Sequence, residues 1–88
     1  MTGYAIHDPG SLPGQIVLAR RKLTAQQLSS ALTLWSQTHE RIGTFIGITD
    51  DAVFYSCDEN WNPRQPGAFD DLRFIPWAVI DEVLRGLQ

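Results

Sequence analysis

Residues 23–35, Leu-Thr-Ala-Gln-Gln-Leu-Ser-Ser-Ala-Leu-Thr-Leu-Trp, carry the clearest local signal in the sequence. Thr24 and Gln27 fit the Ser/Thr-x-x-Glu/Gln capping box, in which each of the two side chains accepts a hydrogen bond from a backbone N–H at the start of a helix. Apolar residues then recur at spacings of three and four, which places them on one helix face: Leu28, Ala31, Leu32 and Trp35. We therefore predict a helix that starts after Thr24 and ends near Thr38.

The residues before this helix show two different patterns. Residues 1–13 contain Pro9, Gly10 and Pro13, and we predict that they form an irregular arm. Residues 14–21 fit either a short helix or a strand. Ser11 and Pro13 favour the helix, because serine caps helices and proline suits their first turn. Residues 14–88 are then expected to form a single domain.

The second half of the chain shows strand patterns and a final helix. Residues 44–49 and 52–57 are rich in β-branched and aromatic residues and flank Asp50 and Asp51, which predicts an antiparallel β-hairpin. Residues 72–75 can supply a third short strand, and Pro76 can open a helix over residues 77–87. On that helix we expect an ion pair between Asp81 and Arg85. The predicted fold is a small α+β domain with an N-terminal helical pair, a hairpin, a third strand and a C-terminal helix.

Size and composition fit one compact domain. The chain has 88 residues, of which 43% are hydrophobic and 19% charged, a balance that supports a core and does not match the profile of disorder. Cys57 is the only cysteine, so no internal disulfide can form and the reducing cytoplasm is the expected location. No segment of the sequence approaches the roughly 20 apolar residues of a membrane span.

The sequence contains no recognisable catalytic or metal-binding motif. His7 and His39 lack a second histidine or cysteine at metal-ligand spacing, and Cys57 has no neighbouring base that would mark it as a nucleophile. A net charge of −3 argues against nucleic acid as a partner, and so does the absence of lysine and arginine from residues 25–35. We expect a protein that is not an enzyme and that binds no cofactor.

One set of residues follows a recognisable order between Pro13 and Ile46: Gly14, Ile16, Val17, Leu23, Thr24, Gln27, Leu28, Ala31, Leu32 and Arg41-Ile42-Gly43. This order resembles the helical repeat in the N-terminal domains of type II secretion and type IV pilus assembly ATPases, the MshEN type. The resemblance implies an interaction domain, which binds cyclic di-GMP in some members of the family. Here Leu12, Arg21 and Trp35 replace the first arginine, the glycine before the turn and the terminal glutamine of that motif. We therefore expect no cyclic di-GMP binding.

The strongest candidate for a binding site is the polar, proline-containing loop over residues 58–71. Trp61 lies in it between Asn60 and Asn62, where no periodic pattern dictates burial. Two interpretations stay open: Trp61 is an exposed anchor for a partner, or it folds back over the small core. The candidate partner-binding residues are Trp61, Asn60, Asn62, Arg64 and Phe69.

These observations favour a small adaptor or regulatory protein of bacterial or phage origin that binds another protein through this loop and an adjoining helix face. The alternative is an inhibitor encoded by a phage or mobile element, which would occlude a site on its target. Cyclic di-GMP and DNA binding rank below both. The sequence also allows a homodimer.

Overall fold

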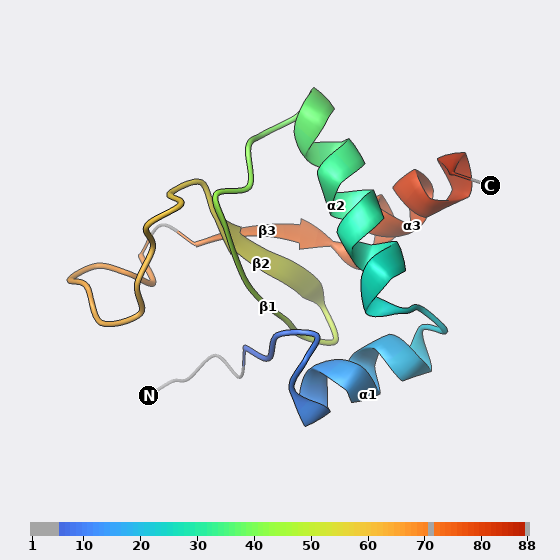
Figure 1. Cartoon of the computed structure of the whole chain (residues 1–88), viewed down its shortest axis with the longest axis horizontal. Helices are drawn as coiled ribbons and strands as arrows, with labels where there is room; N and C mark the ends of the chain where they lie inside the picture. The colour runs from blue at the N-terminus through green and yellow to red at the C-terminus, as the bar shows by residue number, and fades with distance from the viewer. Residues whose placement is uncertain (1–5, 71, 88) are drawn as a thin grey trace.

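A computed structural model of the chain describes residues 6–70 and 72–87. It contains the helices α1 (Leu12–Arg20), α2 (Ala25–Thr38) and α3 (Trp77–Gly86) and the strands β1 (Thr44–Ile48), β2 (Ala52–Ser56) and β3 (Arg73–Pro76) (Figure 1). The strands form one antiparallel sheet in the order β1-β2-β3. The predicted α+β class, with its helical pair, hairpin, third strand and last helix, is confirmed.

The segment before α2, for which the sequence allowed either a helix or a strand, forms the helix α1. The Ser11 hydroxyl caps α1 by accepting a hydrogen bond of 3.2 Å from the Gly14 N–H, and proline lies in the first turn. The helix starts at Leu12, earlier than the predicted Gly14, so Leu12 and Pro13 belong to α1 and not to the irregular arm.

The described part of the arm is tied to the edge of the sheet. The Ile48 N–H donates to the His7 carbonyl at 2.6 Å, and the His7 N–H donates to the Ile48 carbonyl at 3.3 Å. Gly47 permits this approach, since a Cβ at that position would collide with the Ile6 side chain. The rest of the predicted arm, residues 1–5, lies outside the described residues.

Helix α2 forms as its sequence predicts. The Thr24 hydroxyl accepts from the Gln27 N–H at 3.1 Å, and the Gln27 side-chain oxygen accepts from the Thr24 N–H at 2.8 Å, so the capping box is complete. The helix ends at Thr38, as expected. Leu28 is 1% exposed and is one of the most deeply buried side chains, while Trp35 is only partly buried beside the core.

The hairpin turn is closed by the Thr49 N–H, which donates to the Ala52 carbonyl at 2.9 Å. The Thr49 hydroxyl also accepts from the Asp51 and Ala52 N–H groups, so the turn satisfies its own backbone donors. A bulge between Phe45 and Gly47 shifts the register of β1 against β2. As the central strand, β2 is buried along most of its length.

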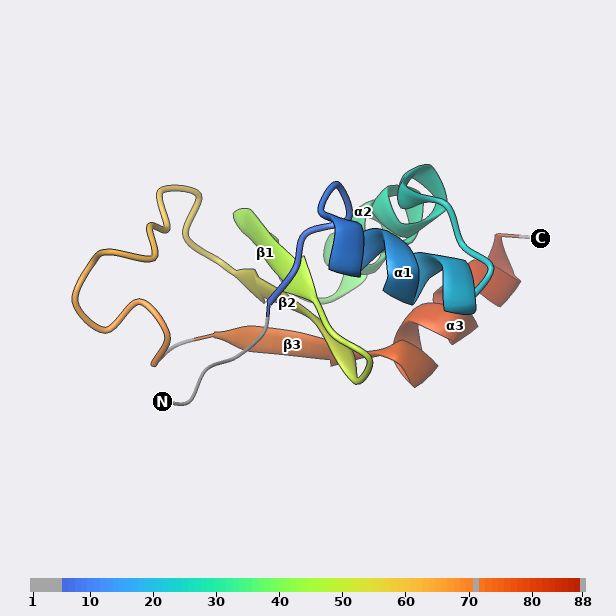
Figure 2. The same ribbon diagram turned by 90° about the horizontal axis from the view of Figure 1, so that it is seen from below.

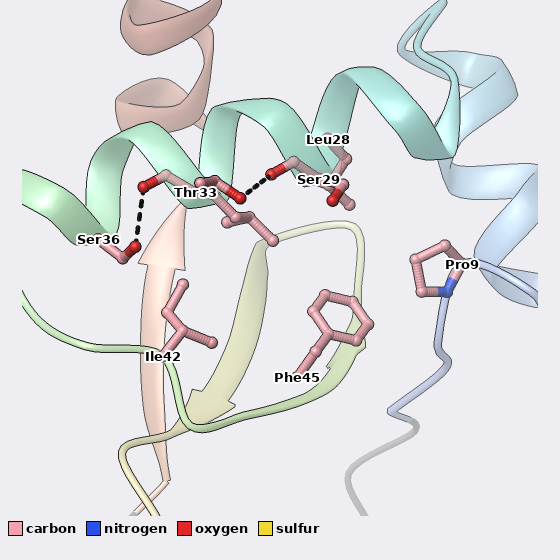
Figure 3. A pocket seen from close by; sticks show the side chains of 8 residues that line it. Pro9, Leu28, Ser29, Thr33, Ser36, Ile42 and Phe45 are labelled. Carbon is pink, nitrogen blue, oxygen red and sulfur yellow. Dashed lines mark hydrogen bonds between the residues drawn. The ribbon is translucent and has the colours of Figure 1, made fainter. Parts of the chain in front are cut away.

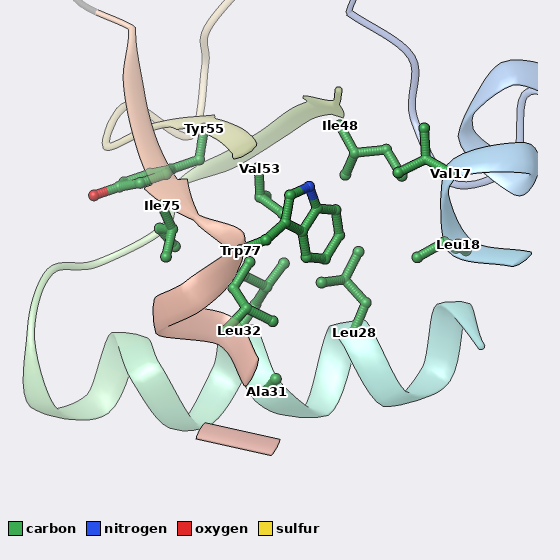
Figure 4. Close-up of a cluster of buried hydrophobic side chains, with 11 residues drawn as sticks. Val17, Leu18, Leu28, Ala31, Leu32, Ile48, Val53, Tyr55, Ile75 and Trp77 are labelled. Carbon is green, nitrogen blue, oxygen red and sulfur yellow. The ribbon is translucent and has the colours of Figure 1, made fainter. Parts of the chain in front are cut away.

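The core lies between the sheet and α2, with side chains from α1 and α3 completing it (Figure 4). Trp77 is 3% exposed, and its indole N–H donates to the Thr49 carbonyl at 2.8 Å. The Arg21 guanidinium lies over the same ring, 4.3 Å from its centroid. Arg21 also reaches Asp81 at 3.6 Å. The expected Asp81–Arg85 pair is therefore wrong: the stacked guanidinium draws Asp81 toward α1.

The molecule is elongated, with principal extents of 41 × 28 × 18 Å. The connection between β2 and β3 projects from one end, and the helices gather at the other end (Figures 1 and 2). Within the described ranges, no helix combines the length and the apolar character that crossing a membrane requires.

Two leucines of α2 provide a matched test of this core. Leu28→Ala should lower the free energy of unfolding by about 2–5 kcal/mol, because it opens a cavity in a packed interior. Leu34→Ala removes the same atoms from a side chain that is 39% exposed, and should change it by less than about 0.5 kcal/mol. Urea unfolding at low protein concentration measures both. Equal effects would contradict the assignment of the buried face.

Candidate functional site

Over residues 58–70, the loop between β2 and β3 is ordered by its own backbone, while Asp71 of the predicted 58–71 loop lies outside the described residues. Four N–H groups donate to carbonyls three residues earlier, as in successive β-turns: Trp61 to Asp58 at 3.2 Å, Gln65 to Asn62 at 3.1 Å, Ala68 to Gln65 at 3.1 Å and Asp70 to Gly67 at 3.0 Å. Two acidic or amide side chains add short bonds, since Asp58 accepts from the Asn60 N–H at 2.8 Å and Asn62 accepts from the Arg64 N–H at 2.9 Å. The loop is a chain of turns with a defined shape.

Trp61 is the centre of this loop. Its indole N–H donates to the Ala68 carbonyl at 2.7 Å across the loop, and its ring meets Phe69 edge-on with the centroids 5.5 Å apart. Ala68 is buried and Trp61 is half-buried, although neither belongs to the main core cluster. Trp61 is thus neither fully exposed nor folded over the core, because it packs inside its own loop.

The other candidate residues line the outside of the loop. Asn60, Asn62 and Arg64 are exposed, and Phe69 is 47% exposed. The structure brings Trp61 and Phe69 into contact and uses Asn62 to shape the backbone before Arg64. Contact of these residues with a partner stays a prediction.

A polar cluster at the base of the loop was not predicted from the sequence. The Tyr55 hydroxyl donates to Glu40 at 2.6 Å, and the other Glu40 oxygen lies 3.2 Å from an Arg73 nitrogen. The three residues come from the connection after α2, from β2 and from β3, which are far apart in sequence, so no local sequence pattern predicts the cluster. It fastens the connection after α2 to both strands that carry the loop.

The electrostatics of the cluster follow from these contacts. The hydrogen bond from Tyr55 lowers the pKa of Glu40 more than partial desolvation raises it. Burial raises the pKa of Tyr55, and the Glu40 carboxylate adds to that rise. Burial and then the same carboxylate raise the pKa of the nearby Cys57 thiol. A raised pKa disfavours the thiolate, which is the form that a nucleophile or a metal ligand needs.

The described residues also offer little to a metal ion. Over residues 6–70 and 72–87, no three histidine, cysteine or acidic side chains come close enough to share a metal. His39 instead stacks flat on Trp35, with ring centroids 4.9 Å apart. Asp50, the first acid of the hairpin turn, pairs with Arg20 at 2.8 Å. His39 and Asp50 are therefore engaged in contacts with other side chains.

A hollow of about 290 Å³ lies between α2 and the start of β1 (Figure 3). Apolar side chains and a row of hydroxyl residues line it: Pro9, Leu28, Ser29, Leu32, Thr33, Ser36, Ile42 and Phe45. The Thr33 hydroxyl donates to the Ser29 carbonyl at 2.9 Å, and the Ser36 hydroxyl donates to the Thr33 carbonyl at 2.8 Å. Because two of its three hydroxyl groups already donate to the helix backbone and the other lining residues are apolar, the hollow suits an apolar side chain better than a polar ligand.

The fold and the loop together define a small α+β domain whose three-stranded antiparallel sheet carries a self-ordered loop at one end. No family model matches the chain, and neither a curated protein nor a solved structure matches it. The resemblance of residues 13–46 to the MshEN-type domain stays a prediction.

The polar cluster predicts the reactivity of the only cysteine. Because the thiolate is the reactive form, Cys57 should react slowly with an aromatic disulfide reagent at about pH 8, and its rate should rise with pH to a midpoint above the ordinary thiol pKa of about 8.5. Glu40→Gln removes one cause of the raised pKa and leaves the burial. The midpoint of its rate profile should fall partway toward the ordinary value.

Glu82→Gln is the matched control, because Glu82 is exposed on α3, and its profile should equal that of the wild type. Absorbance of the released aromatic thiolate records the rates from about pH 6 to pH 10. A Glu40→Gln profile identical to the wild type would contradict the interaction between the carboxylate and the thiol.

Proposed function

We propose that this chain is a small non-enzymatic adaptor or regulatory protein that binds another protein through its 58–71 loop. One observation carries the proposal: the loop is held in shape by its own hydrogen bonds, yet Phe69 is left 47% exposed at its surface. A preformed loop avoids much of the entropy loss that binding imposes on a flexible segment.

The composition of the loop surface supports the same function. Aromatic and arginine side chains are enriched where protein interfaces are most deeply buried, and Phe69 and Arg64 are both exposed here. Asn60 and Asn62 lie nearby as exposed polar residues that suit the rim of an interface. Trp61 contacts Phe69 through the edge-on packing of the two rings.

Further support comes from the polar groups that a catalytic function would need. Glu40 is engaged by Tyr55 and Arg73, and burial together with Glu40 raises the pKa of the Cys57 thiol. A binding function requires neither group to react. We also infer a cytoplasmic location, since a partly buried single thiol fits a reducing compartment.

Two exposed phenylalanines allow a controlled test. The tagged full chain should first capture a partner from a lysate of the organism that encodes it, and the dissociation constant for the purified partner should then be measured. Phe69→Ala should weaken this complex about 30-fold or more, in line with roughly 2 kcal/mol for an aromatic hot spot. Phe74→Ala removes a side chain that is 61% exposed on β3, outside the loop, and should leave the affinity unchanged.

Trp61→Ala separates the role of the loop from that of the core. Because Trp61 packs within the loop, the variant should keep a cooperative melt close to that of the wild type while it binds the partner more weakly. Calorimetric melts and affinities are measured on the same samples. Full affinity in both Phe69→Ala and Trp61→Ala would exclude the loop as the contact surface.

A further inference from the structure

A groove of about 600 Å³ lies between the turn that joins α1 to α2 and the second half of α3. Three of its lining residues are cations, Arg21, Lys22 and Arg85, and only one is an acid, Asp81. The groove belongs to the helical end of the molecule, away from the loop between β2 and β3 (Figure 2). It carries an excess of positive charge, and its use does not depend on the function proposed for the loop.

Two of the three cations have no acidic partner. Ion pairs within residues 6–70 and 72–87 engage four of the seven lysine and arginine residues of the chain. The three left unpaired there are Lys22, Arg64 and Arg85, and two of these line the groove. Arg85 has no partner on its own helix because Asp81 pairs with Arg21 instead. The groove therefore offers two cations that an incoming carboxylate can neutralise.

The third cation is held in place by the fold. The Arg21 guanidinium stacks on the buried Trp77 ring, 4.3 Å from its centroid, and a stacked guanidinium still has N–H groups at its edge for a carboxylate. The positive end of the α2 dipole adds to the same field, since Thr24 and Gln27 line the groove and the first turn of α2 contains no acid. One cation is thus fixed before any ligand arrives.

Lys22 has a backbone conformation that lysine normally avoids. Among the described residues it is the one residue other than glycine with a positive φ, 58°. It occupies the position after the end of α1 where a Schellman motif normally has glycine. The motif is complete, because the Lys22 N–H donates to the Ala19 carbonyl at 3.1 Å and the Leu23 N–H donates to the Leu18 carbonyl at 3.0 Å. The turn itself favours glycine, so the lysine side chain points to a role outside the fold.

Apolar side chains line the groove between the charges. Leu23 and Leu84 are half-buried, and Leu87 is 50% exposed. The Asp81 carboxylate opposes a ligand with dense negative charge, such as a phosphate, more than it opposes a single carboxylate. The occupant that fits both features carries separate carboxylates with hydrocarbon side chains between them.

We propose that this groove binds an acidic segment of another protein, in which aspartate or glutamate residues are interspersed with apolar residues. The carboxylates of the segment contact Lys22, Arg85 and the edge of Arg21. Its apolar side chains cover Leu84 and Leu87. The fixed Arg21 reduces the loss of side-chain freedom on binding, and the leucines add a contact that salt does not screen.

The distribution of charge along the chain supports an acidic ligand at this end. Of ten acids and seven cations in the sequence, residues 58–71 contain four acids and one cation. Six of each remain in the rest of the chain, so the whole net charge of −3 belongs to that loop. The loop lies at the opposite end of the molecule (Figure 1), so its repulsion of an acidic segment at the groove is weakened by distance and salt.

Selection of random peptides of about ten residues, displayed on phage, against the immobilised full chain tests the groove. Peptides that no longer bind Phe69→Ala use the loop and are set aside. The remaining peptides should be enriched in aspartate and glutamate together with leucine, isoleucine or phenylalanine. Synthetic copies should bind more weakly in about 0.5 M than in about 0.05 M salt, because screening weakens exposed charge pairs. Fluorescence anisotropy measures the dissociation constants.

Two substitutions of Lys22 and a matched control locate the contact. Lys22→Glu should weaken peptide binding about ten-fold or more, because it replaces an attraction by a repulsion. Arg64→Glu makes the same change of charge at an unpaired, exposed arginine outside the groove and should leave the affinity within about two-fold. Lys22→Gly should also weaken binding, yet should not lower the melting temperature, because glycine accepts the positive φ without strain.

Arg85→Glu is a second variant on the other wall of the groove and should weaken binding as Lys22→Glu does, with circular dichroism to confirm that each variant is folded. Three results overturn the proposal: no peptide is selected, the remaining peptides lack an acidic bias, or acidic peptides bind both glutamate variants as they bind the wild type. A DNA oligonucleotide of about 12 nucleotides that binds the wild type more tightly than the peptides also overturns it, since nucleic acid is then the better occupant.

Discussion

The rest of this fold depends on the contacts that the buried indole of Trp77 makes. An indole that leaves water needs an acceptor for its N–H, and here the Thr49 carbonyl in the hairpin turn supplies it at 2.8 Å. Trp77 is also the first residue of α3, and its ring lies under the guanidinium of Arg21, the C-cap residue of α1. One side chain therefore joins three segments that the sequence separates widely, and it sets where α3 leaves the sheet.

A second set of polar contacts fixes the opposite end of the sheet. Glu40, just after α2, binds Tyr55 on β2 and Arg73 on β3, so the two strands that carry the loop are fixed to the helical layer where the loop begins and ends. Two further contacts reach the loop itself: Arg41 pairs with Glu59 at 2.7 Å, and the Thr44 hydroxyl donates to the Asp58 carbonyl at 2.7 Å. The loop is therefore ordered by its own turns and is also fixed to the rest of the fold where it leaves β2 and enters β3.

How well the sequence predicted each feature depends on how far apart in the sequence the interacting residues lie. The capping box of α2 acts within four residues, and the hairpin turn is equally local, so both were predicted correctly. At α1, periodicity alone left helix and strand open, and the Ser11 cap decides between them. The cluster around Glu40 depends on tertiary pairing with Tyr55 and Arg73, for which the sequence carries no local signal.

Trp61 and Asp81 show how tertiary contacts can redirect a local interpretation. The two expectations for Trp61 were exposure or burial in the core, but a hydrogen bond to Ala68 creates a third environment inside the loop. The Asp81–Arg85 spacing is favourable on an isolated helix, where such a pair is worth only a few tenths of a kcal/mol. That gain is too small to hold Asp81 once the Trp77 ring brings Arg21 within reach.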